Sequence, residues 1–381
     1  PKQRKRKNNI FAASGMPGPD ACKSEADAKV EHDMLERPKD RILFYGNLCL
    51  DNVLEVAAYP KEDTGSRALA SRKVLGGNGA NSTRVLKQLR GGRCTVSWIG
   101  PVPRRGDPDT AFALGVLEAD GVDTSLLEEV GGEGLPTSFI VTSRESGSRT
   151  IVSTRNGVRE LGEAHLEAAV RRMLQEEARL GRPCWCHLEC RQAPEVTARM
   201  AEAWRSVTGD RALPLSVEVE KPGMDVSGVV ALLGTCTHAF FSSEWIKAHE
   251  DELLADGSVT EPAEKRQRTE EQRQQLAPRC LSALRGRAPG AAGLWVCAWG
   301  DLGAFALDAA TGTSYFQPAV KQARVVDSVG AGDTFNAATI HALASGAGPQ
   351  LALECGCAVA GRKVAQVGLG SLRDAVPAGL A

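Results

Sequence analysis

The stretch Arg324-Val-Val-Asp-Ser-Val-Gly-Ala-Gly-Asp-Thr-Phe-Asn336 decides the fold that we expect for this chain. Its pattern predicts the end of a strand, a glycine turn, and then a helix that ends near Gly346. Gly330 and Gly332 allow the backbone to turn tightly and to approach a ligand closely. The N–H groups at the helix start then form an anion site, which stabilises a negative group by roughly 0.3 to 1 kcal/mol.

Asp333 stands at the same turn, although a carboxylate repels anions. The combination makes chemical sense if a hydroxyl gives its proton to the carboxylate while it attacks phosphorus. The alternative is a glycine-rich turn with aspartate as a helix cap, which needs no chemistry. Two familiar phosphate motifs do not explain it, because the chain has no G-x-x-x-x-G-K-[ST] and residues 330–332 lack the third glycine of a dinucleotide fingerprint.

The composition is that of an ordinary globular protein and excludes several functions. Apolar residues make up 42% of the 381 residues and charged residues 24%, which suffices for a large core in one or two domains. The net charge of -1 argues against nucleic acid as a partner. We expect no membrane contact, because no apolar run approaches the ~18 residues of a span. The 11 cysteines fit buried free thiols in a reducing compartment.

Residues 1–38 differ from the rest of the chain. A basic cluster between Lys2 and Lys7 precedes a stretch rich in Gly, Pro, Ser and Ala with little apolar periodicity. This pattern predicts a disordered basic tail. We expect a cytoplasmic protein, with nuclear or organelle targeting by the basic cluster as an open alternative.

Apolar runs that end in glycine or in polar residues predict the fold class. They begin at Arg41, Cys94, Cys184, Leu215, Ala239 and Leu294. Alternation of strand, polar tip and helix is typical of an α/β protein with a doubly wound, mostly parallel central sheet flanked by helices. The run Cys184–Cys190 favours a strand over a zinc site, because a C-x-C-H-x-x-C run cannot easily surround a metal while it forms a strand.

Two polar groups near the N-terminal strands are candidate ligands for a polyol. Asp51 follows the first strand, where it either holds sugar hydroxyls or forms a turn. The run Gly76-Gly-Asn-Gly-Ala-Asn-Ser82 then starts a helix that closes at Gly91. Asn78 and Asn81 lie three residues apart on one helix face and suit a polyol, while helix capping is the alternative.

Three other features are candidates for phosphate or nucleotide binding. Residues 136–154 alternate as paired strands, and Arg149 just past their turn either reaches a phosphate or remains solvated. Gly300-Asp301-Leu302-Gly303 supplies flexible backbone near the anion site. Cys357 and Gly361 belong to a small-residue face of the last helix, where a flat ring such as adenine and close helix packing are equally good explanations.

Residues 250–287 form a charged insert, which we expect to be a solvated helix or a disordered surface segment. Amphipathic helices are expected over residues 110–120 and 161–180.

With these pieces in order, the chain resembles the ribokinase-like (PfkB) carbohydrate kinases. Gly76–Ser82 resembles the N-terminal signature of that family, and Val326–Asn336 resembles its long C-terminal signature. His187–Arg191, Ser216–Pro222 and Val296–Trp299 are similar to the ketohexokinase (fructokinase) branch. The similarity runs from about residue 41 to 370, within a kinase domain expected over residues 39–375.

The resemblance implies an ATP- and Mg²⁺-dependent kinase that phosphorylates a primary hydroxyl of a sugar, with fructose first and K⁺ dependence open. It implies Asp333 as the general base, with Gly330, Ala331 and Gly332 as the anion hole. It implies that the sugar contacts Asp51, Gly77, Asn78, Asn81 and Asp333. It implies that ATP contacts Arg149, Gly300, Asp301, Leu302, Gly303, Gly330, Ala331, Gly332, Cys357 and Gly361. Strands over about 51–75 and 136–154 would form a small β-sheet lid that joins a homodimer.

Departures from the family pattern leave the metal unassigned. Ser242-Ser-Glu-Trp245 stands where the family has N-x-x-E, and Val364 replaces a cysteine of the ketohexokinase pattern. The alternatives are a relative that acts on ribose, another fructokinase, a nucleoside kinase or a kinase for a keto-deoxy acid. A further alternative is a catalytically idle relative that binds a protein partner through the basic tail and the charged insert.

Overall fold

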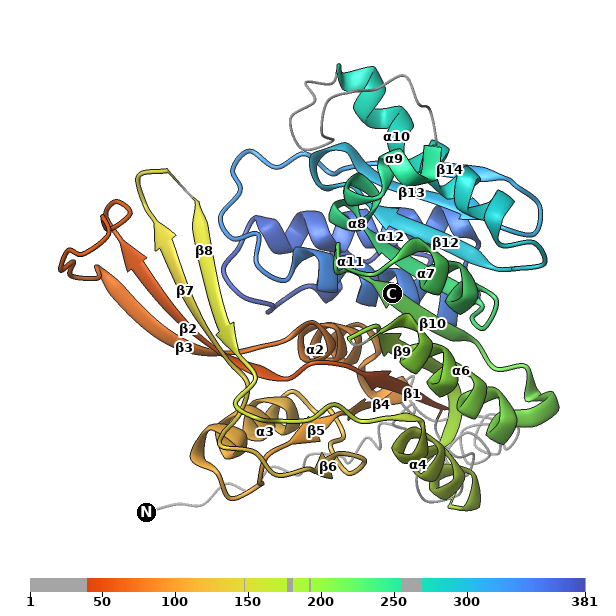
Figure 1. Cartoon of the computed structure of the whole chain (residues 1–381), viewed down its shortest axis with the longest axis horizontal. Coiled ribbons are helices and arrows are strands. Elements are labelled where there is room, and N and C mark those ends of the chain that lie inside the picture. The colour runs from red at the N-terminus through yellow and green to blue at the C-terminus, as the bar shows by residue number, and fades with distance from the viewer. Residues whose placement is uncertain (1–39, 147, 177–180, 192, 255–268, 381) are drawn as a thin grey trace, which may run out of the picture. The chain divides into compact units, whose positions relative to one another are not determined.

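One mostly parallel sheet runs through the described residues, in the strand order β14-β13-β12-β11-β10-β9-β1-β4 (Figure 1). The computed structural model describes residues 40–380 except 147, 177–180, 192 and 255–268. Neighbouring strands from β12 to β4 are parallel, and β13 and β14 add an antiparallel edge. The strands are β1 (Asp40–Tyr45), β4 (Cys94–Ile99), β9 (Arg182–Glu189), β10 (Leu215–Val219), β11 (His238–Ser242), β12 (Leu294–Ala298), β13 (Gly303–Asp308) and β14 (Ser314–Pro318).

Helices cover both faces of this sheet because buried side chains alternate along its strands. In β1, Ile42 and Phe44 belong to one core, and Leu43 and Tyr45 belong to the other. The first core is closed by α2 (Asn78–Arg90), α11 (Ala331–Ala344) and α12 (Pro349–Val364). The second is closed by α4 (Glu163–Gln175), α6 (Pro194–Thr208), α7 (Val226–Leu233), α8 (Ser243–Ala248), α9 (Glu250–Leu254) and α10 (Glu270–Arg287). The predicted doubly wound α/β class is therefore confirmed.

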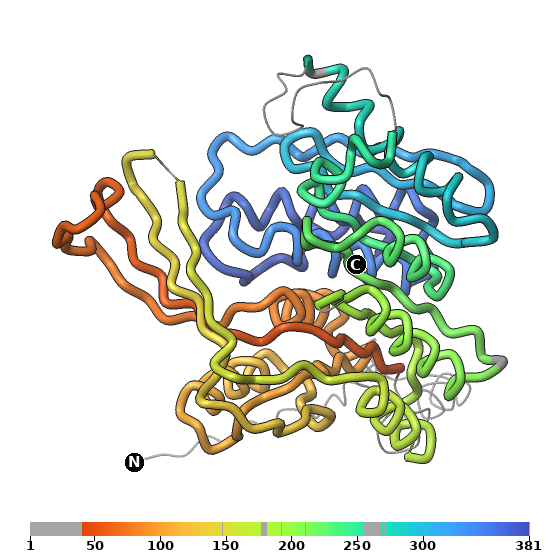
Figure 2. Tube along the Cα trace, in the orientation of Figure 1, coloured from red at the N-terminus to blue at the C-terminus, as the bar shows by residue number. Residues whose placement is uncertain are grey.

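A second sheet, in the order β3-β2-β7-β8, extends away from the main sheet (Figure 2). We call it the lid; its strands are β2 (Cys49–Val56), β3 (Ala70–Gly76), β7 (Thr137–Ser143) and β8 (Arg149–Thr154). A third, smaller core lies beside its base, around α3 (Pro108–Ala119), β5 (Pro101–Val102) and β6 (Glu128–Glu129). The small sheet expected from the sequence is therefore present.

Glycines allow the start of α2 to lie directly against the end of β1. A Cβ added at Gly79 would lie 2.5 Å from the Cα of Gly46, so neither position tolerates a side chain. Gly77 has φ 102° and lies against the carbonyl of Asn47, which also accepts a hydrogen bond from Ala80 N. This contact fixes where α2 begins relative to the carboxyl edge of the main sheet.

The structure differs from the sequence predictions at several places. Residues 324–328 form no strand, because the backbone there is held by contacts to α12, such as the one from Val326 N to Val364 O. Asp51 lies inside β2 instead of past the end of a strand. In the charged segment, α10 is only partly solvated, since Leu276, Cys280, Leu281 and Leu284 of this helix are buried.

Other expectations fall partly or wholly outside the described residues. These are the basic tail at 1–38, residues 255–268 of the charged insert and residues 177–180 of the helix predicted over 161–180. Within the helix predicted over residues 110–120, Phe112 is exposed on α3. No helix within the described ranges is both long and apolar enough to cross a membrane.

Candidate active site

The glycine turn at Gly330–Gly332 forms the N-terminus of α11. Gly330 caps the helix with φ 76°, a conformation that favours glycine, and Ala331 begins the helix. A Cβ added at Gly332 would meet nothing within 4 Å, so open space lies in front of the turn. The helix start therefore has the geometry of an anion site with room for a ligand.

Asp333 lies in the first turn of α11 and is joined to α2. Its Oδ2 accepts a hydrogen bond of 2.8 Å from Asn81 Nδ2, and its carbonyl accepts one of 3.2 Å from Ser82 Oγ. Burial raises the pKa of Asp333 to about 7, the bond from Asn81 opposes that rise, and the negative charges of Glu220 and Glu189 add to it. A carboxyl with a pKa near 7 is suited to accept a proton at neutral pH.

Further carboxylates surround Asp333 at the carboxyl ends of β9 and β10. Glu218 accepts a hydrogen bond of 2.8 Å from Asn336 Nδ2, and burial with its acidic neighbours raises the pKa of Glu218 well above its usual value. Lys221 partly offsets this charge at Asp333. Sequence reasoning placed polar tips on these strands but did not bring them to Asp333, because that requires the strand order.

An ion pair between a fully buried lysine and a half-buried aspartate holds the segment that leads into the glycine turn. Lys363 of α12 is fully buried, and its Nζ lies 2.9 Å from Asp327 Oδ2 and 2.7 Å from the Asp327 carbonyl. Asp327 also accepts from the N–H groups of Val329 and Gly368. Burial opposes ionisation of Asp327, but these bonds outweigh it and lower the pKa of this carboxyl. Sequence reasoning missed Lys363, whose only signal is a lysine within an apolar helix.

Arg149 brings the lid to the glycine turn. It stands at the start of β8, and its Nη1 donates a 3.0 Å hydrogen bond to Ser328 Oγ, although the two residues are 179 positions apart. A guanidinium at this place is positioned for phosphate oxygens at the N-terminus of α11.

Asp51 lies within the lid and is buried against its own sheet. It accepts a hydrogen bond from Cys49 Sγ at 3.4 Å, and a Cβ at Gly76 would lie 2.2 Å from its Oδ2. Burial raises the pKa of Asp51, and hydrogen bonds from Cys49 and Ser138 oppose the rise. Gly77 and Asn78, at the start of α2, are half-buried beside the same strands.

The remaining nucleotide candidates gather around segment 317–321. A short 3₁₀ turn, Gly300–Leu302, precedes Gly303, whose φ of 120° brings it against Gln317 O. Lys321 Nζ donates to Asp301 O at 2.8 Å. Cys357 Sγ lies 3.8 Å from Gln317 O, and a Cβ at Gly361 would lie 2.9 Å from Val320 Cβ. Close packing thus accounts for both small residues of α12, and the structure brings them to the same segment as the turn.

Comparison with known proteins places this geometry in a family. The family model described as "pfkB family carbohydrate kinase" matches residues 39–181 and 287–375. Ketohexokinase of Mus musculus is 31% identical over 327 residues, which cover 85% of this chain and 95% of that protein.

Solved structures share the fold at lower identity. The ribokinase of Arabidopsis thaliana, complexed with ribose and ATP, gives a TM-score of 0.63 at 18% identity and covers 90% of this chain and 96% of its own. Phosphofructokinase-2 of Escherichia coli, in complex with potassium, gives a TM-score of 0.61 at 16% identity and covers 89% of this chain and 96% of its own. The ribokinase-like fold predicted from the sequence is therefore confirmed.

Breaking the ion pair behind the glycine turn should destabilise the protein. Lys363→Met removes the cation from the half-buried Asp327 carboxylate, and we expect the free energy of unfolding to fall by about 1.5 to 3 kcal/mol. Lys73→Met is the matched control, because its partner Asp109 and the lysine are both exposed, and it should cost about 1 kcal/mol or less. Urea unfolding of both variants measures the difference, and equal effects would contradict the role given to Lys363.

Proposed function

The chain belongs to the pfkB family of carbohydrate kinases and is an ATP-dependent sugar kinase, and from this premise we propose that it phosphorylates the primary 1-hydroxyl of fructose. The observation that carries the proposal is the pairing of Asp333 with Asn81 at the N-terminus of α11. It supports the proposal because it holds a carboxylate at a helix start whose backbone amides would stabilise a transferring phosphoryl group.

In the proposed mechanism, Asp333 takes the proton from the sugar hydroxyl as its oxygen attacks the γ-phosphorus in line. Gly330, Ala331 and Gly332 at the helix start face the charge that develops on the phosphoryl oxygens. General-base help contributes ~10²- to 10⁴-fold, so positioning and electrostatics must supply most of the acceleration.

Sugar contacts are proposed on the lid and on α2. Asp51, Gly77, Asn78 and Asn81 lie on β2 and at the start of α2, which the glycine contact with β1 holds together. Fructose is proposed as the acceptor because the mouse relative is named for a ketohexose and matches along most of this chain.

Nucleotide contacts are proposed at the start of β8 and at the 3₁₀ turn that precedes β13. Arg149 already reaches Ser328 and would bind phosphate oxygens. Gly300, Asp301, Leu302 and Gly303 would line the nucleotide with their backbone.

Magnesium would arrive with the nucleotide. No group of three or more His, Cys, Asp and Glu side chains suited to a metal occurs among the described residues. The absence of a metal cluster among these residues is compatible with Mg²⁺, because substrate phosphates commonly hold this ion with only one or two carboxylates. Glu220 near Asp333 is a candidate for such a carboxylate. When bound, the ion neutralises charge on the phosphates. Dependence on K⁺ stays a prediction.

The acceptor should be identified by a panel of substrates. We expect ADP release to be fastest with fructose in a panel that also contains ribose, a nucleoside, a keto-deoxy acid and fructose 6-phosphate. Asp333→Asn should lower turnover at least ~100-fold while ATP still binds. A preference for another acceptor would correct the substrate, and near-normal turnover of Asp333→Asn would remove Asp333 from the base role. If ADP were released with none of these acceptors, the result would favour the alternative of a catalytically idle relative.

Activity should depend on the ionisation of Asp333. Since only the ionised carboxylate accepts a proton and burial raises its pKa to about 7, kcat/KM should rise with pH through about 7 and fall on acidification. Asn81→Ala removes a hydrogen bond that lowers this pKa, so the midpoint should move to higher pH. Gln275→Ala, an exposed amide on α10, should leave the midpoint in place. An unmoved or lower midpoint in Asn81→Ala would refute the assignment.

We also propose that two copies associate through the outer face of the lid. Phe139 of β7 and Val152 of β8 are directly opposite each other in the strand register and are 51% and 64% exposed. Leu54 of β2 is exposed on the same face. An apolar face of this kind on a thin sheet favours a second copy as its cover.

Sedimentation velocity can test this association. Phe139→Asp should convert a dimer into a monomer, because it buries a charge in the proposed interface. Ile151→Asp is the control, since Ile151 is also 51% exposed but points to the opposite face of the same sheet. A wild-type monomer, or a dimer that survives Phe139→Asp, would reject this interface.

A further inference from the structure

We infer that Arg191 is a positioning residue that joins two of the four connections of the lid, which we call its roots, to the end of β9 and thereby sets the place of the lid over the acceptor site. The inference rests on the proposed sugar contacts of the lid, and it concerns residues to which the mechanism gives no role. Glu160, Glu189 and the backbone of Asn47 complete the set, which we call the hinge network.

The chain enters the lid twice, into β2 and into β7, and leaves it twice, from β3 and from β8 (Figure 1). The two roots that concern us are Asn47, which precedes β2, and residues 155–161, which follow β8 and lead into α4. β2 carries Asp51, and β8 carries Arg149. Groups that hold these two roots therefore restrain the two strands that carry these proposed ligand contacts.

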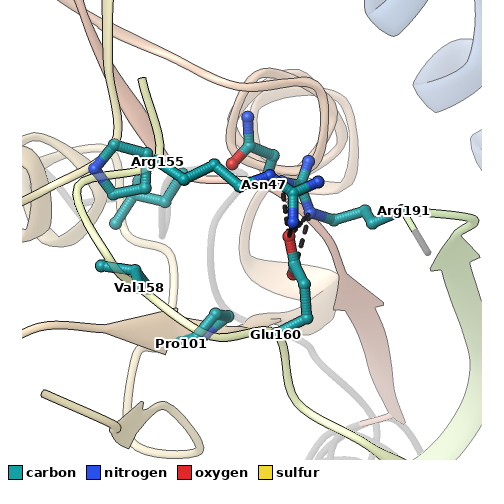
Figure 3. A pocket seen from close by; sticks show the side chains of 8 residues that line it. Asn47, Pro101, Arg155, Val158, Glu160 and Arg191 are labelled. Carbon is teal, nitrogen blue, oxygen red and sulfur yellow. Dashed lines mark hydrogen bonds and ion pairs between the residues drawn. The ribbon is translucent and has the colours of Figure 1, made fainter. Parts of the chain in front are cut away.

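Arg191 binds the root formed by residues 155–161 through Glu160. Its Nε lies 2.9 and 3.0 Å from the two carboxylate oxygens of Glu160, and its Nη2 lies 2.8 Å from Oε1. Arg155 of the same root adds a contact of 3.3 Å to Oε1. Figure 3 shows both arginines pointing toward the Glu160 carboxylate. Tyr45 of β1 donates a hydrogen bond of 3.3 Å to the carbonyl of Leu161, the residue after Glu160.

The same guanidinium reaches the incoming root through Glu189, the last residue of β9. Arg191 Nη1 donates to Glu189 Oε1 at 3.0 Å, and Glu189 Oε2 accepts from the backbone N–H of Asn47 at 2.6 Å. One charged side chain, two residues past the end of β9, thus links the first and the last connection of the lid.

The surroundings of the network leave it little freedom. The side chains of Arg191, Glu160 and Glu189 are only 11%, 7% and 4% exposed. The cavity beside them measures about 10 Å³, which is at the lower limit for one water molecule and excludes a larger ligand. Both oxygens of each carboxylate are engaged inside the network.

The charge of Arg191 maintains the network, and the packing of Gly46 against α2 links the network to the acceptor site. Burial alone would lower the pKa of Arg191, but Glu189 and Glu160 outweigh it and raise that pKa, so the guanidinium stays charged. A Cβ at Gly46 would lie 2.7 Å from Glu189 Oε2 and 2.6 Å from Gly79 Cα. The incoming root therefore cannot shift without disturbing α2, which carries Asn78 and Asn81.

The test combines kinetics with hydrogen exchange on the full chain. Glu160→Gln, Arg191→Gln, Arg191→Lys and the double variant are assayed with saturating ATP and the acceptor of highest kcat/KM in the panel. A misplacement of about 1 Å can cost ~10²-fold, so we expect Arg191→Gln to raise KM for the acceptor at least ~10-fold. Exchange in β2, β7 and β8 should accelerate. Arg191→Lys should recover part of both losses.

A double-mutant cycle distinguishes the network from general damage. Because Glu160 and Arg191 act on the same root, the double variant should be little worse than Arg191→Gln alone. Arg199→Gln serves as the control, since it removes an exposed pair between Arg199 on α6 and Glu163 on α4 and should leave KM and lid exchange unchanged. If Arg191→Gln does not fold, the isosteric Glu160→Gln carries the test.

Some outcomes would overturn the inference. These are strictly additive effects, an unchanged KM with unchanged lid exchange, or a loss of kcat alone, which would assign Arg191 to chemistry. An inactive Asp333→Asn beside a normal Arg191→Gln would reject the hinge network but keep the proposed function. A fully active Asp333→Asn would reject the proposed base whatever Arg191 does.

Discussion

The hydrogen bond from Asn81 to Asp333 joins the starts of two helices that are 252 residues apart in the sequence, and the site depends on it. It places a proton acceptor from α11 beside the polar face of α2. The bond is possible because Gly79 lets α2 begin directly against β1, where a side chain would collide with Gly46. A strand end, two helix starts and a carboxylate thus share one small volume.

Keeping charge at this edge of the sheet requires compensation. Burial and the acids at the ends of β9 and β10 raise the pKa of Asp333 to about 7, which makes it a better base near neutral pH than an exposed aspartate. The neighbouring charges are paired: Lys363 holds Asp327 behind the anion turn, and Arg191 holds Glu160 and Glu189 below the lid. These pairs favour one arrangement of charges over the alternatives, because an unpaired buried charge is costly.

The lid connects these two groups of charges. Arg149 of its strand β8 donates a hydrogen bond to Ser328 at the glycine turn. Two of its connections to the main body are held by the hinge network. The lid would therefore help to position the sugar and the phosphate relative to Asp333. It contacts the main body both through the hinge network and through Arg149 at the start of β8. Catalysis by positioning needs such restraint, since the chemical step itself requires little from the side chains beyond proton transfer.

The sequence by itself determined the α/β class, the glycine turn at Gly330 and the helix start at Asn78, because apolar period, glycine and capping residues report local backbone conformation. It also selected Asp333, since a carboxylate at an anion turn is a local anomaly. Only the tertiary structure placed Asp51 inside a lid strand, brought Arg149 to Ser328 and paired Lys363 with Asp327. Such pairs join residues far apart in the chain, and they depend on strand order and helix packing, which no local pattern records.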